Sequence, residues 1–298
     1  MTRTRPLLRR TAGPAAAALL IAGFAFVDAE RASGALSDGF PDAVPICKGA
    51  DGKLGRDGRL LAMSAQLASL DGLVRVADST TGSLNTEDNL DLFEKLGLME
   101  GHLVIGKALL DARMQDDALP HFGHPVRELY DYLKPVFAER KYPEFERQLQ
   151  ELEHRATEAP NEAATAAAFD DVISRIDGLR RSIPGALLGS ADFLIMGIAL
   201  MVDDAAGDLG ESLDKGRIAN TVEYHDAMGF ARYADGAVRS YAGILGARAD
   251  ALAHETAFTL SAFPSLKPPS HPVRSVGDLR DAAERVKASA KTAPARAG

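Results

Sequence analysis

Apolar side chains recur every three or four positions along most of the chain, starting at about residue 59. This spacing is typical of one face of an amphipathic helix, whereas a half-buried strand alternates strictly. No stretch of alternating apolar and polar residues is flanked by the signals of hairpin turns. The pattern therefore predicts an all-α fold, an antiparallel helical bundle with short connections and no sheet. The expected helices cover about residues 59–78, 85–113, 115–122, 125 onward, 143–158, 162–182, 187–210, 216–260 and 275–289.

Polar and proline-containing breaks indicate where these helices begin and end. Asn85 opens a helix whose first turn carries acidic residues, a combination that suits a helix amino terminus. At His124-Pro125 we expect one helix to end and the next to begin. Proline is tolerated at the first helical position, and it pushes the residue before it out of the helical conformation. Pro184-Gly185 is expected to end a later helix.

The first 35 residues differ from the rest of the chain. Four arginines lie within the first ten residues, and an apolar run from Gly13 to Val27 follows, with small residues after it. This layout is typical of a secretory signal peptide, and the run is shorter than an ordinary membrane span. We therefore assign residues 1–35 to a signal peptide. The expected location is periplasmic or secreted, with no membrane span after removal of the signal.

Three further parts follow the signal peptide. Residues 36–58 are rich in Gly, Asp and Pro, which predicts a loop-rich arm. Residues 59–263 carry the helical pattern and form the bundle domain. Four prolines then open the segment 264–298, which we interpret as a Pro-rich linker, a short helix and a disordered tail.

Charge and cysteine content exclude several functions. Removing residues 1–35 removes five Arg against one Asp and one Glu, so the net charge falls from −8 to −11, which argues against nucleic acid as a partner. Cys47 is the only cysteine, and no C-x-x-C-H motif for c-type haem occurs. No phosphate loop, G-x-S-x-G or H-E-x-x-H is present either. We expect no nucleotide cofactor and no catalytic residue.

Three of the seven histidines lie between residues 102 and 124. A turn near Met114 would fold a short helix back on the long one, which places His121 opposite residue 107. That position is about one helical turn from His102 at 1.5 Å per residue. The imidazoles of a hairpin folded in this way are expected to converge.

A carboxylate close to these histidines in the sequence can complete a ligand set. His124 and Glu128 are four residues apart and share a helix face. Imidazole combined with carboxylate suits zinc, copper, iron or nickel. The sequence therefore predicts a transition-metal site, or a site for a metal-bound ligand, at His102, His121, His124 and Glu128.

A second cluster of ionisable residues lies in the stretch from Glu223 to Asp226. Glu223 and Asp226 are three residues apart and share a helix face, so the pair can add carboxylates to a site in the bundle core. Glu223 is included as a weaker ligand candidate, while His225 should point about 100° away. Four acids near the end of the helix over 187–210 are expected to form a solvated face: Asp203, Asp204, Asp208 and Glu211.

Glycines recur inside two of the predicted helices. Gly229, Gly236 and Gly243 are spaced seven residues apart, which places them on one helix face. A glycine in a helix interior costs about 1 kcal/mol relative to alanine, so we expect each to face a closely packed neighbouring helix.

Two other interpretations of the same residues remain open. In the first, the histidines serve the fold alone, with His102 bonded to a carbonyl in the core and His124 capping its helix. Alternatively, the protein is a non-enzymatic scaffold that binds another protein of the cell envelope. Ile105, Gly106 and Phe122 match positions of a tetratricopeptide helix hairpin, but the 34-residue period is not continued.

One resemblance to known proteins rests on two segments, Leu96–Leu103 (LGLMEGHL) and His121–Tyr130 (HFGHPVRELY). They resemble a group of uncharacterised, exported, all-helical proteobacterial proteins with motifs of the type LGLMxGHL and HFGHPxxELY. This resemblance implies a helical exported protein and no particular activity. A looser likeness is to imelysin-type periplasmic proteins, which are helical and linked to iron uptake. Their G-x-H-x-x-E motif is absent, because Gly101-His102 lacks that spacing.

Overall fold

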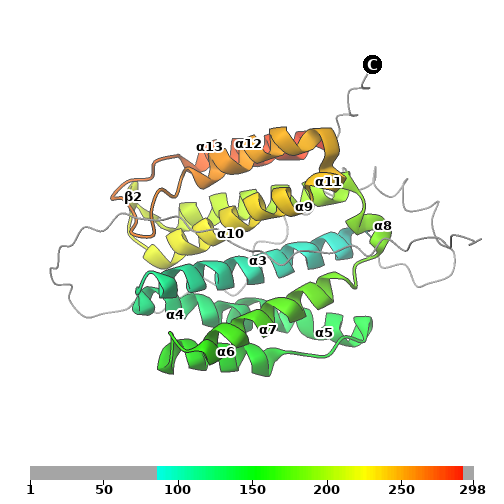
Figure 1. Ribbon diagram of the computed structural model, residues 1–298. Coiled ribbons are helices and arrows are strands. Elements are labelled where there is room, and N and C mark those ends of the chain that lie inside the picture. The colour runs from blue at the N-terminus through cyan, green and yellow to red at the C-terminus, as the bar shows by residue number, and fades with distance from the viewer. Residues whose placement is uncertain (1–85, 291–298) are drawn as a thin grey trace, which may run out of the picture. The chain divides into compact units, whose positions relative to one another are not determined.

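The computed structural model describes residues 86–290, which are predominantly helical (Figure 1). The all-α class predicted from the sequence is confirmed. The predicted signal peptide, the loop-rich arm, the helix expected at 59–78 and the last eight residues lie outside the described residues. Within 86–290, no helix has the length and apolar character that crossing a membrane requires.

The helices follow one another with short connections, except for residues 261–275 between the last two. In chain order the elements are α3 (Thr86–Asp111), α4 (Gln115–His124), the π-helix η1 (Pro125–Leu129), α5 (Tyr130–Arg140), α6 (Glu146–Glu158), α7 (Ala163–Arg180), α8 (Gly185–Leu188), α9 (Ala191–Glu211), β1 (Leu213–Asp214), β2 (Arg217–Ile218), α10 (Thr221–Ser240), α11 (Ala242–Leu245), the 3-10 helix η2 (Gly246–Arg248), α12 (Ala249–Leu260) and α13 (Val276–Ser289).

The helices stack in layers around α3, α9 and α10. Helices α12 and α13 pack on α9 and α10, and α3 packs against the other side of α10 (Figure 1). Beyond α3 lie α4, α6 and α7. Leucine, phenylalanine and alanine side chains from all these layers form one continuous buried core. Because α3 and α10 are central, side chains that face each other across them are shielded from water.

Glycines allow α3 and α10 to cross with their backbones in contact. A Cβ added at Gly229 would lie 2.4 Å from the carbonyl oxygen of Gly101. This is the close helix contact that the seven-residue spacing predicts, and Gly236 is also buried in α10. The prediction is wrong for Gly243, which lies in α11 with open space around it. Helix α10 ends at Ser240, before the third glycine of the series is reached.

The helix expected over 216–260 is two helices. Helix α10 ends at Ser240, and α12 begins at Ala249 and packs back on α10. Gly246 has a φ of 59°, in the left-handed region that favours glycine. The first residues of the expected helix form a small hairpin instead, β1 paired with β2, whose turn contains Lys215 and Gly216 at positive φ. This hairpin departs from the expectation of no sheet.

At His124-Pro125, by contrast, two helices that were expected to be separate are continuous. The chain does not break there but continues from α4 through the π-turn η1 into α5. His124 keeps helical angles, with φ −55° and ψ −43°, despite the proline that follows it. A proline removes one hydrogen bond from the helical ladder, and the wider π-turn accommodates this loss. Such turns are frequent at functional sites. His121 and His124 consequently stay on one helix.

Candidate metal centre

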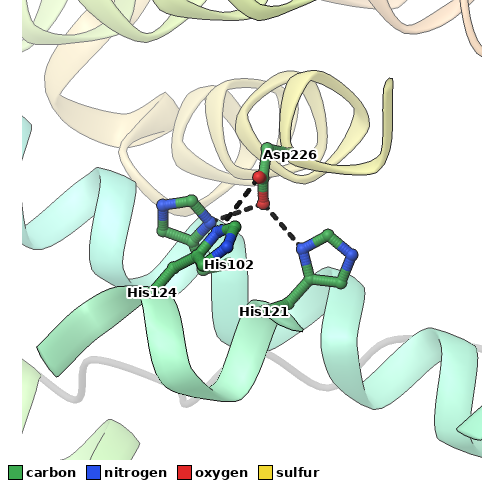
Figure 2. Close-up of side chains that lie close together, drawn as sticks. All are labelled: His102, His121, His124 and Asp226. Atoms are coloured by element: carbon green, nitrogen blue, oxygen red, sulfur yellow. Dashed lines mark hydrogen bonds and ion pairs between the residues drawn. The ribbon is translucent and has the colours of Figure 1, made fainter. Parts of the chain in front are cut away.

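Three histidines and one aspartate from three helices meet in the core (Figure 2). His102 comes from α3, His121 and His124 from the last turn of α4, and Asp226 from α10. The chain reverses between α3 and α4 at Arg113, which has a φ of 65°. A Cβ added at Gly106 would lie 3.3 Å from the Cβ of His121. The fold-back geometry expected from the sequence is therefore present, one residue from the expected register.

All three imidazoles direct a nitrogen at the carboxylate of Asp226. Oδ1 of Asp226 accepts hydrogen bonds from Nδ1 of His102 at 2.6 Å and from Nδ1 of His121 at 2.7 Å. Nδ1 of His124 lies 3.1 Å from Oδ2, although the angle there does not suit a hydrogen bond. The imidazole of His102 is thus bonded to a side chain that lies 124 residues away, and not to a carbonyl.

The four residues are buried, and their charges are coupled. Burial alone would raise the pKa of the Asp226 carboxyl, but the charges of His102 and His121 and their hydrogen bonds hold it well below its usual range. For His124, burial acts to lower the pKa, but the contact with Asp226 and the charge of Glu128 raise it overall. Asp226 is therefore an anionic centre enclosed by imidazoles.

Besides Nδ1 of His124, two buried imidazole nitrogens at this centre have no hydrogen-bond partner within the described residues. They are Nε2 of His121 and Nδ1 of His225, whose rings lie 5.5 Å apart. His225 donates from Nε2 to the carbonyl of Leu266 at 2.7 Å. Burial lowers the pKa of His225, so its ring is neutral and its Nδ1 is an acceptor. If Nδ1 of His121 carries the proton donated to Asp226, Nε2 of His121 is a buried acceptor without a donor, which is unfavourable.

A metal ion bound by Nδ1 of His121 would remove this conflict. The imidazole would then carry its proton on Nε2, and a rotation of the rings, which lie 5.5 Å apart and are not hydrogen bonded, would be needed to donate it to Nδ1 of His225. Ligand histidines commonly use their second nitrogen in this way, and the bond fixes both the tautomer and the ring orientation. His225 bonds to Leu266 and is not part of the group around Asp226, which agrees with the 100° offset expected from the sequence.

The two glutamates predicted as ligands lie at the edge of the cluster. Glu128 follows on the π-turn, with its carboxylate 3.7 Å from Nε2 of His102 and 3.8 Å from Nδ1 of His124, and its side chain is 48% exposed. It therefore connects the buried group to solvent. Glu223 does not join the histidines but belongs to a second group with Asp208 and Asp226.

The sequence interpretation missed the position of Asp208. It was expected on a solvated face, but its side chain is half-buried at the end of α9, because α10 and α13 cover that helix. Burial and the nearby carboxylates of Asp226 and Glu223 raise the pKa of Asp208 well above its usual value. Nothing in the local sequence separates Asp208 from its exposed neighbour Glu211; only the packing of α9 does.

Comparison with known proteins finds no matching family model, no matching curated protein and no matching solved structure. The function is therefore inferred from the geometry and chemistry of the site. The buried cluster of His102, His121, His124 and Asp226 offers four ligand atoms within 4.8 Å of one another and can hold a metal ion.

Proposed function

We propose that the protein is an exported binding protein that holds a transition-metal ion between His102, His121, His124 and Asp226. The export half of the proposal rests on the layout of residues 1–35. The metal half rests on one observation above all: three buried imidazoles from two helices direct a nitrogen at one buried carboxylate of a third. Burying so many polar groups is costly unless each is satisfied.

The donor set and its spacing fit such an ion. Three imidazole nitrogens and one carboxylate oxygen form a set that zinc, copper, iron and nickel accept. Around a tetrahedral ion with metal–ligand bonds near 2.0–2.1 Å, neighbouring ligand atoms are about 3.3 Å apart. Nδ1 of His124 already lies 3.1 Å from the carboxylate, while the contacts at 2.6 and 2.7 Å must open by about 0.6 Å. A rotation of the rings suffices for a change of this size.

Glu128 gives the buried site a route to solvent. Its half-exposed carboxylate lies within 4 Å of both His102 and His124. We expect it to attract an incoming cation and pass it to the imidazoles, since a site enclosed on all sides exchanges metal slowly. The strongly negative charge of the chain favours the approach of cations.

The test is metal retention by the purified chain. After treatment with a chelator, the protein is offered zinc, copper, iron and nickel in turn, and both bound metal and the unfolding temperature are measured. At a free-metal concentration 100 times Kd, binding should add about 2.7 kcal/mol to the stability. His121→Gln should lose the metal, whereas His154→Gln, a change at an exposed histidine of α6, should not.

Two results would contradict the proposal. One is that none of the four metals is retained and none shifts the unfolding temperature. The other is that the His121→Gln variant retains metal as well as the wild type. Either result would mean that the imidazoles only hydrogen bond to Asp226. The scaffold interpretation would then gain, although it does not account for the convergence of the rings, since His124 lies 5.0 Å from His102 and 5.7 Å from His121 between ring centres.

A further inference from the structure

The carboxylate of Glu128 lies beside two of the imidazoles and has no other charged partner among the described residues. Its Oε2 is 3.7 Å from Nε2 of His102, and its Oε1 is 3.8 Å from Nδ1 of His124. The adjacent Arg127 does not neutralise it, because that guanidinium pairs with Glu153 at 3.0 Å. The carboxylate of Glu128 is therefore available to the histidines.

The ring of His102 has a carboxylate near each of its two nitrogens. Nδ1 bonds to Oδ1 of Asp226 at 2.6 Å, whereas Nε2 faces Glu128. An ion bound at Nδ1 would replace the proton there, so the neutral ring would carry its proton on Nε2. Nδ1 of His124, the other nitrogen near Glu128, would be occupied by the same ion. Nε2 of His102 would then be the N–H group that faces Glu128.

We propose that Glu128 is an outer-shell positioning residue, which accepts a hydrogen bond from Nε2 of His102 when a transition metal is bound at Nδ1. This inference rests on the proposed function, because the ion is what fixes the proton on Nε2. A carboxylate placed in this way orients the imidazole and makes its other nitrogen a stronger donor to the metal. Glu128, which the sequence predicts as a ligand, acts instead through His102.

The bond requires only a small movement of one side chain. The distance of 3.7 Å between Oε2 and Nε2 must shorten by about 0.9 Å to reach the length of a bond to a charged acceptor. The side chain of Glu128 is 48% exposed, so its carboxylate can rotate toward the ring without displacing the core. The π-turn η1 and the buried Leu129 hold its backbone one helical turn beyond His124, which keeps the carboxylate within reach.

This bond can be distinguished from the attraction of incoming cations by Glu128. A charge at the entrance of a site mainly changes the rate of association and its dependence on salt, whereas a bond that is broken on release changes the rate of dissociation. Glutamine retains an oxygen that accepts a hydrogen bond but carries no charge, and alanine retains neither. Substitutions at Glu128 therefore separate the two effects.

The test measures zinc uptake and zinc release by stopped-flow mixing with a coloured chelator. Glu128→Ala should release zinc about 10–100-fold faster than the wild type, as loss of an outer-shell partner does. Glu128→Gln should take up zinc more slowly but should restore most of the slow release, because its amide oxygen accepts the same bond. Glu139→Ala removes an exposed carboxylate from α5 and should release zinc like the wild type.

A second measurement needs no substitution at Glu128. Nitrogen-15 NMR of the zinc-loaded wild type, with the His102 signals assigned by their absence in His102→Gln, should place the ring proton on Nε2. A proton on Nδ1 would overturn the inference, because Nε2 would then be the ligand. Circular dichroism checks that the variants are folded.

The outcomes separate this inference from the proposed function. A folded Glu128→Ala variant that releases zinc at the wild-type rate overturns the positioning role and leaves the metal site intact. Equally fast release from Glu128→Gln and Glu128→Ala overturns it as well, because the charge or direct ligation by the carboxylate would then be what holds the metal. A wild type that retains no zinc overturns both proposals.

Discussion

Adding one methyl group at Gly229 should separate the two helices that form the site. In Gly229→Ala, the new Cβ would lie 2.4 Å from the carbonyl oxygen of Gly101, where ordinary contact begins at 3.4 Å. The oxygen belongs to the backbone of α3 and the Cβ is attached directly to the backbone of α10, so neither can rotate away, and the two helices must move apart by about 1 Å.

The cost of this movement can be compared with the gain from replacing glycine. Overpacking costs about 1–3 kcal/mol, and a backbone clash belongs at the upper end of that range. Alanine in a helix gains about 1 kcal/mol over glycine. The net loss is then about 2 kcal/mol. The same movement would lengthen the bond between His102 and Asp226 from 2.6 Å to about 3.6 Å, beyond hydrogen-bond distance.

Gly243→Ala is the matched control, because nothing lies within 4 Å of a Cβ at that position. It should stabilise the protein by about 0.4–1 kcal/mol through the unfolded state. Urea denaturation of both variants measures the two effects, which should appear as opposite shifts of the midpoint at unchanged slope. A midpoint that rises in Gly229→Ala as much as in Gly243→Ala would refute the close helix crossing.

Three further changes test other parts of the structure. Arg180→Met should lower the free energy of unfolding by about 3–5 kcal/mol, measured by urea denaturation. The reason is that the buried carboxylate of Glu100, 2.6 Å from the guanidinium, loses its partner. A loss below about 1 kcal/mol would contradict this. Hydrogen bonds from the backbone and side chain of Ser275 lower the pKa of Asp278 below 3.8, so its stabilising effect is present at neutral pH and lost as the pH falls through the folded-state pKa. The stability gap between wild type and Asp278→Asn should therefore close on acidification, and a gap that is constant with pH would disprove the capping role. His225→Leu should weaken zinc binding about 10–100-fold, as loss of an outer-shell partner does, and His225→Gln should restore part of it; equal affinities in all three proteins would exclude the orienting role.

The sequence predicts the local features of this fold well. The helical period indicates the all-α class, and the turn near Met114 is enough to place His121 against α3. These features depend on residues near one another in the chain. The π-turn at Pro125 and the break at Gly246 were missed, because proline and glycine each permit more than one backbone conformation and tertiary packing selects between them.

The central residue of the site, Asp226, is harder to predict from the sequence. Asp226 lies more than 100 residues beyond His102 and His121, and the helical pattern gives only the face that it shares with Glu223. The register of α10 against α3 brings it to the histidines, and that register depends on the contact between Gly101 and Gly229. Asp208 is harder still, since its burial results from the covering of α9 by two other helices.

The most direct test of the central claim is X-ray absorption spectroscopy at the zinc edge, on the chain loaded with one equivalent of zinc. The proposed site predicts a shell of nitrogen and oxygen ligands at about 2.0–2.1 Å, with the outer scattering of imidazole rings, and loss of that signal in His121→Gln. A sulfur shell at about 2.3 Å would assign the zinc to Cys47 instead. A shell of oxygen alone would show that the histidine cluster binds no metal.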